Sequence, residues 1–427
     1  MDQLILPPVR NVDGTIQLPG SKSLSNRVLL LAAFARGDTE VHNLLESDDT
    51  KHMIDSLRNL GTSLVLSDDG TTCNVTGIGG PFPFDHADLY LGASGTDIRL
   101  LCSAVCLGDG IFSLTGEPRM FERPIRDLVE PLTGLGAEFE YLGNEGYPPL
   151  RIKASGLKGN QSYVRGNISS QYLTSLLVSA PMMLKEFSIN VEGELVSKPY
   201  IDMTVEMIRR FGIDVINDQY KMFRIPKSNG YESPGKALVE GDASSATYFL
   251  SAAAIKGGTV RVNGVGVDSV QGDIEHAVVL EKMGATVRWG PDWIEVSGAP
   301  LHGIDIDLNH MPDAAMTVAA TALFAEGKTT IRNIYNWRIK ETDRLSAMAT
   351  ELKKVGAEVV EGEDYLEIVP PDQILPASID TYNDHRMAMC FSLASLGDSE
   401  IIINDPGCVS KTFPDYFSQF QNIIKTK

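Results

Sequence analysis

Apolar positions along the chain follow two patterns, helical spacing and strand alternation, and the order of these patterns recurs roughly every seventy residues. Helix-like runs end at a glycine, as at 280–285 and 352–357, which is typical of a left-handed C-terminal cap. An alternating strand, a turn and a second strand then follow, as at 286–296 and 358–369. The pattern predicts a unit of helix, strand, helix, strand and strand, present six times.

The sixth copy is incomplete at the C-terminus, where residues 414–424 are predicted to form the last helix. The extended segment 4–18 at the start of the chain could supply its missing strands, so both termini are expected in one domain. At 427 residues the chain is too long for a single core. We therefore expect two domains of three repeats each.

Two sets of polar residues recur at matching points, each just before a helix-like run. The first set is Lys22, Gly95, Ser169, Asp242, Asp313 and Asp384. The second set is Asp48, Arg123, Lys198, Gln271, Glu341 and Lys411. Helix N-termini carry unpaired N–H groups and the positive end of the helix dipole, and equivalent helices of a repeat tend to point the same way. The pattern predicts a cleft for small, multiply charged anions.

The charge distribution agrees with such a cleft. A net charge of −19 argues against a nucleic-acid partner, because the overall field repels phosphate backbones. Basic residues nevertheless gather near the helix starts: Lys22, Arg27, Arg119, Arg123, Arg126, Arg338, Lys340, Arg344, Arg386 and Lys411. Cations are disfavoured there, and Lys340 and Arg344 would repel each other on one helix. An anion between them would explain the placement; the alternative is that each is simply solvated.

The lengths of the apolar stretches, the first ten residues and the cysteine spacing indicate the compartment and whether a metal is bound. The longest uncharged apolar stretches, 28–35 and 100–107, are too short to span a bilayer, and residues 1–10 do not form a secretory signal. Five cysteines show no metal or redox spacing and suggest reduced thiols. A cytoplasmic enzyme without a membrane partner or metal is expected.

Six long motifs then point to one family. They include Leu-Pro-Gly-Ser-Lys-Ser-Leu-Ser-Asn-Arg at 18–27, Gly-Glu-Pro-Arg-Met-Phe-Glu-Arg-Pro-Ile at 116–125 and Asn-Asp-His-Arg-Met-Ala-Met at 383–389. The other three lie at 239–246, 333–345 and 411–416. In type and order, and over essentially the whole chain, these segments resemble the 3-phosphoshikimate 1-carboxyvinyltransferase (EPSP synthase) family.

The resemblance implies an α/β fold of two similar domains, each an inside-out α/β barrel of three βαβαββ repeats with helices inside and sheets outside. One domain would span 21–239 and bind mainly shikimate 3-phosphate. The other would span 1–20 and 240–427 and carry Asp313, Glu341 and residues for phosphoenolpyruvate (PEP), with hinges near 19–21 and 239–241. It also implies transfer of the enolpyruvyl group of PEP to the 5-hydroxyl of shikimate 3-phosphate, without metal or organic cofactor, by a monomer that glyphosate inhibits at the PEP site.

Site residues are implied one by one. Shikimate 3-phosphate would contact Lys22, Ser23, Arg27, Ser169, Ser170, Gln171, Ser197, Tyr200, Asp313, Asn336 and Lys340. PEP would contact Lys22, Gly95, Arg123, Gln171, Arg344, His385, Arg386 and Lys411. Asp313, Glu341 and Lys22 would move protons, in an order that the sequence leaves open.

Structural alternatives remain for several of these residues. Ser169–Gln171 and Asp313 could serve as helix caps, Glu341 could be a first-turn acid stabilised by the helix dipole, and His385 could be a surface histidine. Each of these roles would be filled without any substrate.

Two other functions are also open. A related enolpyruvyl transferase acting on UDP-N-acetylglucosamine would show Lys-Asn at positions 22–23 and a catalytic cysteine near Arg119, where this chain has none. A phosphosugar-binding module without chemistry would keep the basic residues but would have no reason to keep both Asp313 and Glu341.

The chain departs from the family at Ala93, Leu100 and Phe121, where asparagine, proline and lysine are common.

Overall fold

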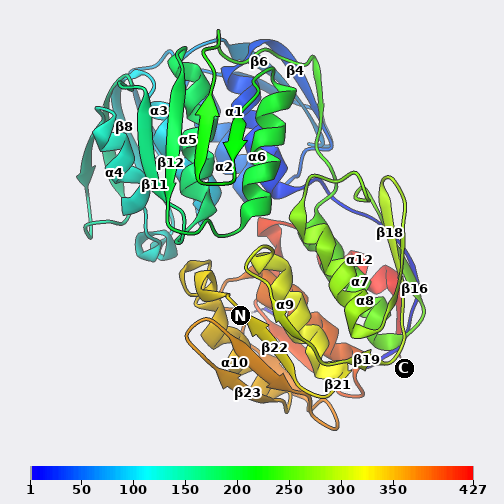
Figure 1. The fold of residues 1–427 in the computed structure, drawn as a ribbon. Coiled ribbons are helices and arrows are strands. Elements are labelled where there is room, and N and C mark those ends of the chain that lie inside the picture. The colour runs from blue at the N-terminus through cyan, green and yellow to red at the C-terminus, as the bar shows by residue number, and fades with distance from the viewer. Residues whose placement is uncertain (1, 427) are drawn as a thin grey trace. The chain divides into compact units, whose positions relative to one another are not determined.

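The computed structural model describes residues 2–426, which divide into two compact units. The middle unit comprises residues 20–239, and the terminal unit comprises residues 1–19 together with 240–427. The chain passes between the units at Pro19/Gly20 and again at Val239/Glu240. The predicted α/β fold with three repeats in each unit is confirmed (Figure 1).

The helices and strands of the middle unit are as follows. They are α1 (Lys22–Phe34), β4 (Arg36–His42), α2 (Asp48–Asn59), β5 (Ser63–Leu66), β6 (Thr72–Ile78), β7 (His86–Tyr90), α3 (Gly95–Val105), β8 (Asp109–Thr115), α4 (Arg126–Gly134), β9 (Glu138–Tyr141), β10 (Leu150–Ser155), β11 (Gln161–Arg165), α5 (Ser170–Ser179), β12 (Phe187–Glu192), α6 (Lys198–Arg210), β13 (Ile216–Asp218), β14 (Met222–Ile225) and β15 (Lys236–Leu238).

The terminal unit contains the following elements. They are β1 (Gln3–Leu6), β2 (Val9–Val12), β3 (Gly14–Gln17), α7 (Ala243–Lys256), β16 (Thr259–Asn263), α8 (His276–Met283), β17 (Thr286–Trp289), β18 (Trp293–Ser297), β19 (Leu301–His302), β20 (Asp305–Asp307), α9 (Pro312–Thr321), β21 (Ala325–Glu326), β22 (Thr329–Arg332), α10 (Arg344–Lys354), β23 (Glu358–Glu361), β24 (Leu366–Val369), β25 (Ala377–Ile379), α11 (His385–Ser392), β26 (Ile401–Asn404), α12 (Tyr416–Ile423) and β27 (Ile424–Thr426).

Each repeat contains one strand more than the hydrophobic pattern predicts. In the second repeat, β7 precedes α3 and pairs parallel with β8, which pairs antiparallel with β10, and β9 completes the sheet. Strand β7 is an edge strand that buries only Leu89 fully. One buried side chain leaves little alternation in the sequence, which is why the pattern missed this strand.

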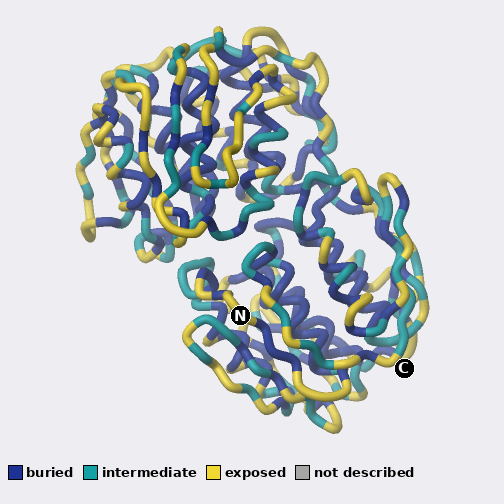
Figure 2. The backbone as a smooth tube through the Cα atoms, viewed as in Figure 1, coloured by how far each residue is buried: buried dark blue, intermediate teal, exposed yellow. Residues whose placement is uncertain are grey.

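Helices α1, α3 and α5 form the inside of the middle unit, and α7, α9 and α11 form the inside of the terminal unit. In α9 every residue from Ala314 to Thr321 is buried, and Figure 2 shows such helices in dark blue among exposed strands and loops. Their alanine, serine and threonine side chains allow close packing, and the hydroxyls bond across helices, as between Thr247 and Thr317 at 2.8 Å. A helix that is apolar or small on every side is expected in such a position.

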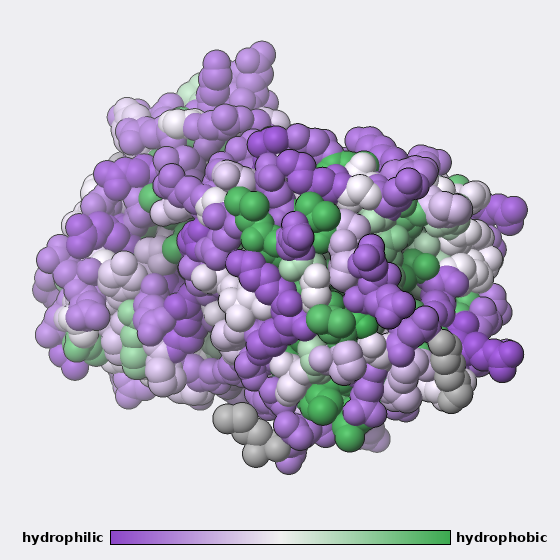
Figure 3. Space-filling model, turned by 90° about the horizontal axis from the view of Figure 1, so that it is seen from below, coloured by the Kyte–Doolittle hydropathy of each residue, from purple (hydrophilic) through white to green (hydrophobic). Residues whose placement is uncertain are grey.

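The sheets face outward. Strand β10 alternates strictly between buried and exposed residues, and several large apolar side chains on outer strands are exposed, among them Ile111 and Tyr163. Figure 3 shows a mainly hydrophilic surface in which apolar residues form separate small groups. One polar and one apolar face per sheet is the pattern that antiparallel pairs permit.

The first three strands of the chain belong to three different sheets rather than to one. Strand β1 pairs antiparallel with β26 and completes the sixth sheet, as predicted. Strand β3 instead pairs parallel with β16 in the fourth repeat, and β2 pairs with β27. The fourth repeat takes β3 because its sheet, like that of the first repeat, needs a parallel first strand; β15 fills that place beside β4. The last helix covers 416–423, slightly shorter than the predicted 414–424.

Candidate active site

The two repeated sets of polar residues differ in their relation to the helices. All six residues of the first set lie between the N-cap and the second residue of a buried helix. In the second set only Asp48 and Lys198 begin a helix. Arg123, Glu341 and Lys411 lie three to five residues before the next helix, in or beside turns of 3₁₀ helix. Because these three residues precede the next helix, their side chains do not project from its surface.

In the terminal unit, Asp313 is the centre of a group of cations. The N-cap of α9 is Met311, so Asp313 is a first-turn residue and not the helix cap. Its Oδ1 accepts a hydrogen bond from Arg344 Nη1 at 2.8 Å, and its Oδ2 accepts one from Arg386 Nη2 at 3.0 Å. Lys340 Nζ lies 3.9 Å from Oδ1.

The cations determine the charge of Asp313. Burial by itself would raise the pKa of this carboxyl group, but the charges of Arg386, Lys340 and Arg344 outweigh burial and hold the pKa well below its usual value. Asp313 is therefore a carboxylate at neutral pH. Its side chain keeps 17% of its surface exposed, so a substrate can still reach it.

Arg344 pairs with three carboxylates of the group. It is 1% exposed and bonds Asp384 through Nε at 2.8 Å and Nη2 at 3.2 Å. Nη2 also lies 2.9 Å from Glu341. Burial lowers the pKa of Arg344, but the carboxylates of Asp384, Glu341 and Asp313 raise it more, so it stays charged. The planar guanidinium fork suits several carboxylates at once.

Glu341 and its neighbours lie in the turn before α10. Glu341 Oε1 is 3.5 Å from Lys411 Nζ, and the cap of α10 is Asp343. The interpretation of Glu341 as a first-turn acid is therefore wrong. Lys340 also precedes the helix, so the expected repulsion between Lys340 and Arg344 on one helix does not arise. Asn336 lies in the preceding 3₁₀ turn η5 (Tyr335–Ile339) and is buried.

His385 and Arg386 begin α11. His385 is fully buried, with Nδ1 3.5 Å from Asp384 Oδ1, so the interpretation as a surface histidine is wrong. Arg386 donates to the hydroxyl of Tyr248 at 3.1 Å as well as to Asp313. Asp384 caps α11 by accepting from Arg386 N at 3.0 Å, and it thereby joins two site arginines.

In the middle unit, Lys22 and Ser23 begin α1. Lys22 Nζ lies 3.5 Å from Asp49 Oδ2, which is almost fully buried on α2. Arg27 donates to Thr204 Oγ1 at 2.9 Å and to the carbonyl of Ser23 at 2.8 Å. Burial lowers the pKa of Arg27 to about 10 although Tyr200 and Asp97 oppose it, so Arg27 remains charged at neutral pH.

A second basic cluster surrounds Gly95 at the start of α3. A side chain at Gly95 would place its Cβ 2.3 Å from Arg123 Nη2 and 2.5 Å from Arg99 Nη1, so it would displace both guanidinium groups. Arg99 donates to Gln171 Oε1 at 2.7 Å, and Gln171 Nε2 donates to Thr96 at 3.3 Å. Two arginine side chains and the Gln171 amide therefore lie around the backbone of Gly95.

The predicted serine positions lie at two other helix starts. Ser169 is the N-cap of α5 and accepts from Gln171 N at 3.3 Å, so its helix-capping role is realised. Ser170 is buried as the first residue of α5. Ser197 precedes α6 with a left-handed backbone (φ 55°) and no side-chain cap bond. Tyr200 follows in the first turn of the same helix.

Three further residues belong to these clusters although they were absent from the predicted site. They are Arg99, Asp384 and Asp273. Asp384 carried a signal, since it belongs to the first repeated set. Arg99 carried one too, since it lies in the segment 91–100 that was compared with the family pattern. Asp273 carried none, because a single charged residue inside a turn segment has no distinctive spacing.

The five cysteines offer no reactive thiol. Cys73, Cys102, Cys106 and Cys390 are buried, and Cys408 is half-buried. Burial raises the pKa of Cys73 to about 11 and those of Cys390 and Cys408 to about 12, so these thiols stay protonated near neutral pH. Within residues 2–426, no group of three or more His, Cys, Asp or Glu side chains could hold a metal ion. No helix in that part of the chain is long and apolar enough to cross a membrane.

Comparisons with known proteins agree on one family. A family model described as EPSP synthase (3-phosphoshikimate 1-carboxyvinyltransferase) matches residues 6–420. The chain is 57% identical over 423 residues to a 3-phosphoshikimate 1-carboxyvinyltransferase from Marinomonas sp. (strain MWYL1), covering 99% of this chain and all of the relative. It is 58% identical over 426 residues to that of Shewanella amazonensis, covering all of both chains.

Solved structures give the same picture. An EPSP synthase from Acinetobacter baumannii superposes with a TM-score of 0.82 at 28% identity, covering 99% of this chain and 98% of that one. The enolpyruvyl transferase NikO from Streptomyces tendae, at 18% identity, 99% and 98% coverage and a TM-score of 0.79, shares the fold.

Proposed function

Because the chain belongs to the EPSP synthase family, we propose that it transfers the enolpyruvyl group of PEP to the 5-hydroxyl of shikimate 3-phosphate and releases phosphate. The observation that carries this proposal is the Asp313 carboxylate, kept ionised and partly exposed among Arg344, Arg386 and Lys340. A base beside several anion-binding cations is what this reaction needs.

The reaction proceeds by addition and then elimination. The 5-hydroxyl loses a proton and attacks C2 of PEP, while C3 gains a proton and becomes a methyl group. The resulting tetrahedral intermediate expels phosphate as C3 loses a proton again. Each proton transfer that a placed side chain assists is faster by roughly 10²–10⁴-fold.

Asp313 is the proposed acceptor of the 5-hydroxyl proton. Its low pKa keeps it unprotonated, and its two oxygens are oriented by arginines from two different helix starts. Glu341 and Lys22 are the other groups proposed to move protons. Glu341 lies between Arg344 and Lys411, so a proton gained there would weaken two ion pairs.

The arginines and lysines would hold the anionic substrates. PEP would be bound by Lys22, Arg123, Arg344, Arg386 and Lys411, with Gly95, Gln171 and His385 beside it. Shikimate 3-phosphate would be bound by Lys22, Ser23, Arg27, Ser169, Ser170, Gln171, Ser197, Tyr200, Asp313, Asn336 and Lys340. Charge that develops on PEP in the transition state would be stabilised by cations already in place, a large contribution in a water-poor site.

Phosphate release tests the proposed reaction. The purified protein should release inorganic phosphate when PEP and shikimate 3-phosphate are both present, and none with either substrate alone. Mass spectrometry of the organic product should show a gain of one enolpyruvyl unit on shikimate 3-phosphate. No phosphate release with both substrates would contradict the proposal and leave a binding module as the better explanation.

The UDP-N-acetylglucosamine reaction is a weaker candidate. It would require a reactive cysteine near Arg119, whereas the five cysteines lie elsewhere and are protonated. Replacing shikimate 3-phosphate by UDP-N-acetylglucosamine in the same assay should give no phosphate. We further propose that the enzyme acts as a cytoplasmic monomer and that glyphosate competes with PEP; sedimentation velocity and inhibition kinetics test these two points.

A further inference from the structure

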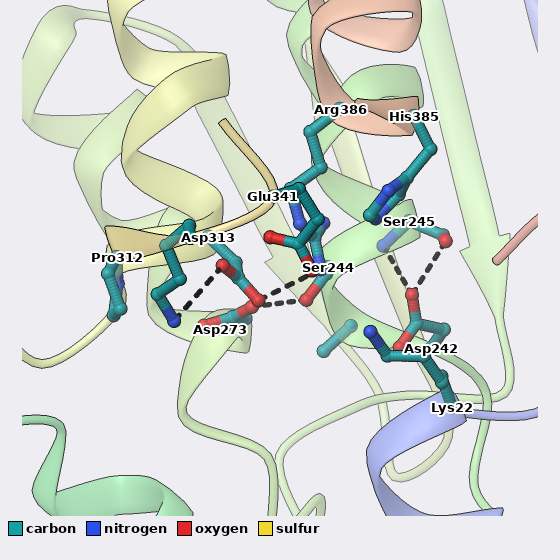
Figure 4. A network of polar contacts seen from close by, with 12 residues as sticks. Lys22, Asp242, Ser244, Ser245, Asp273, Pro312, Asp313, Glu341, His385 and Arg386 are labelled. Carbon is teal, nitrogen blue, oxygen red and sulfur yellow. Dashed lines mark hydrogen bonds and ion pairs between the residues drawn. The ribbon is translucent and has the colours of Figure 1, made fainter. Parts of the chain in front are cut away.

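A buried carboxyl group that the proposed reaction does not use lies next to Asp313. Asp273 is 4% exposed and belongs to the 3₁₀ turn η3 (Gly272–Glu275). Ser244, in the first turn of α7, donates its hydroxyl to Asp273 Oδ2. Figure 4 shows Asp273 and Asp313 as neighbours, with Ser244 beside them. Three helix starts thus bring two carboxyl groups together.

The charged groups that act on Asp273 come from three helices, and Asp313 in addition faces Arg344, Lys340 and Glu341. Asp313 on α9 and the N-cap Asp242 of α7 add negative charge, and Arg386 on α11 adds positive charge. On α8, the buried His276 bonds Ser251 at 2.8 Å, and burial lowers its pKa to about 3, so it is neutral. The positive charge of Arg386 is already engaged by Asp313 at 3.0 Å.

A buried carboxyl group next to a second, partly exposed one cannot ionise together with it without a large cost, so such a pair holds one proton near neutral pH. Asp313 receives hydrogen bonds from two guanidinium groups, which stabilise its charged form. Asp273 accepts a hydrogen bond from the uncharged hydroxyl group of Ser244. The proton therefore belongs on Asp273. Burial first, and the charge of Asp313 second, raise the pKa of Asp273 to about 7, although Ser244 and Arg386 oppose the shift.

We propose that Asp273 is a positioning residue that carries the one proton of this carboxyl pair: neutral Asp273 leaves Asp313 ionised and oriented, and ionised Asp273 weakens PEP binding. The proposal rests on the proposed function, since PEP is the anion that would bind Arg344 and Arg386. When Asp273 releases its proton to solvent, a second negative charge acts on Arg386. The substrate anion must then bind against that charge.

The pH dependence of the PEP Michaelis constant tests the proposal. In the wild-type enzyme KM for PEP should rise above pH 7, by up to about tenfold per pH unit while only the protonated form binds. Asp273→Asn, whose amide mimics the protonated acid, should keep the kcat of the wild type at pH 6.5 and abolish the extra rise. If the variant shows the same rise between pH 6.5 and 8.5, Asp273 does not control PEP binding.

Ser244→Ala gives an independent test that keeps the carboxyl group. The Ser244 hydroxyl lowers the pKa of Asp273, so its removal should move the alkaline rise in KM to higher pH. A purely structural role would change kcat or KM by the same factor at every pH. An unmoved midpoint in Ser244→Ala would contradict the proposal even if Asp273→Asn failed to fold.

Asp343→Asn is the matched control. Asp343 is the carboxyl group at the corresponding point of the next repeat, two residues after Glu341 as Asp273 is two after Gln271. It caps α10, and asparagine caps a helix as well as aspartate does. The pH dependence of this variant should match that of the wild type.

A measurement without substrate separates this inference from the proposed function. Carbon-13 NMR of the protein labelled at aspartate carboxyl groups should show a resonance that titrates near pH 7 and is missing in Asp273→Asn. This outcome holds whether or not the enzyme turns over PEP. A midpoint below pH 5 for that resonance would overturn the proposal while leaving the proposed reaction intact.

Discussion

Replacement of Asp313 by asparagine should lower kcat strongly without weakening PEP binding. The side chain keeps its shape, but its single amide oxygen can accept a hydrogen bond from only one of Arg344 and Arg386, and it can no longer take the 5-hydroxyl proton. The loss of a placed base costs roughly 10²–10⁴-fold in rate. We therefore expect kcat to fall at least a hundredfold by that estimate.

The surrounding charges explain why binding should survive. In the terminal unit the cations Lys340, Arg344, Arg386 and Lys411 are paired with the carboxylates Asp313, Glu341 and Asp384. Without the Asp313 charge, Arg344 is paired with only two carboxylates, Asp384 and Glu341. The net positive charge at the PEP site then increases. KM for PEP should stay constant or decrease, and the protein should lose about 1–3 kcal/mol of folding stability with the charged hydrogen bonds.

Steady-state phosphate release and calorimetric binding of shikimate 3-phosphate measure these quantities. The dissociation constant for shikimate 3-phosphate should stay within about tenfold of wild type, since one neutral hydrogen bond replaces a charged one. Asp343→Asn serves as the control for a carboxyl-to-amide change at a neighbouring aspartate, whose side chain pairs with Arg338. A kcat for Asp313→Asn within threefold of wild type would refute the assignment of Asp313 as the base and leave it a structural partner of the arginines.

Three further results are expected. Shikimate 3-phosphate at a hundredfold excess over its dissociation constant should stabilise the fold by about 2.7 kcal/mol, measured by chemical denaturation; an unchanged midpoint would contradict binding. Ala93→Asn combined with Leu100→Pro should lower the ratio of the glyphosate inhibition constant to KM for PEP. Ala93 lacks an amide whose hydrogen bond is worth about 0.5–1.5 kcal/mol, and Leu100 leaves the backbone of α3 freer than proline would. A ratio that stays the same or rises would show that this loop does not weaken inhibition. Asp273 has a raised pKa of about 7, so the folded state keeps a proton that the unfolded state releases above its ordinary pKa; stability should fall by up to about 1.4 kcal/mol per pH unit between those values and then level off near pH 7. Thermal denaturation of Asp273→Asn should show a smaller fall over this range, and an identical slope would disprove the linkage.

The chain by itself determined the repeat and the chemistry that the repeat carries. Glycine-terminated helical runs and alternating strands are local signals, because each depends on residues within one turn or one strand. The first polar set, from Lys22 to Asp384, therefore marked six helix starts correctly. The long motifs around Lys22, Lys340 and Arg386 indicated the family because so many residue types occur in one order.

Tertiary structure alone decided which groups meet. Strand β7 was missed since an edge strand buries few side chains, and β3 was placed in the wrong sheet because a strand's sequence does not specify a partner more than two hundred residues away. For His385 the alternative of a surface histidine stayed open in the sequence, and only the structure excluded it, because every residue of α11 is buried. Asp273 became a candidate only when folding placed it beside Asp313, because the ionisation of a carboxyl group depends on burial and on neighbouring charge, and neither is local in sequence.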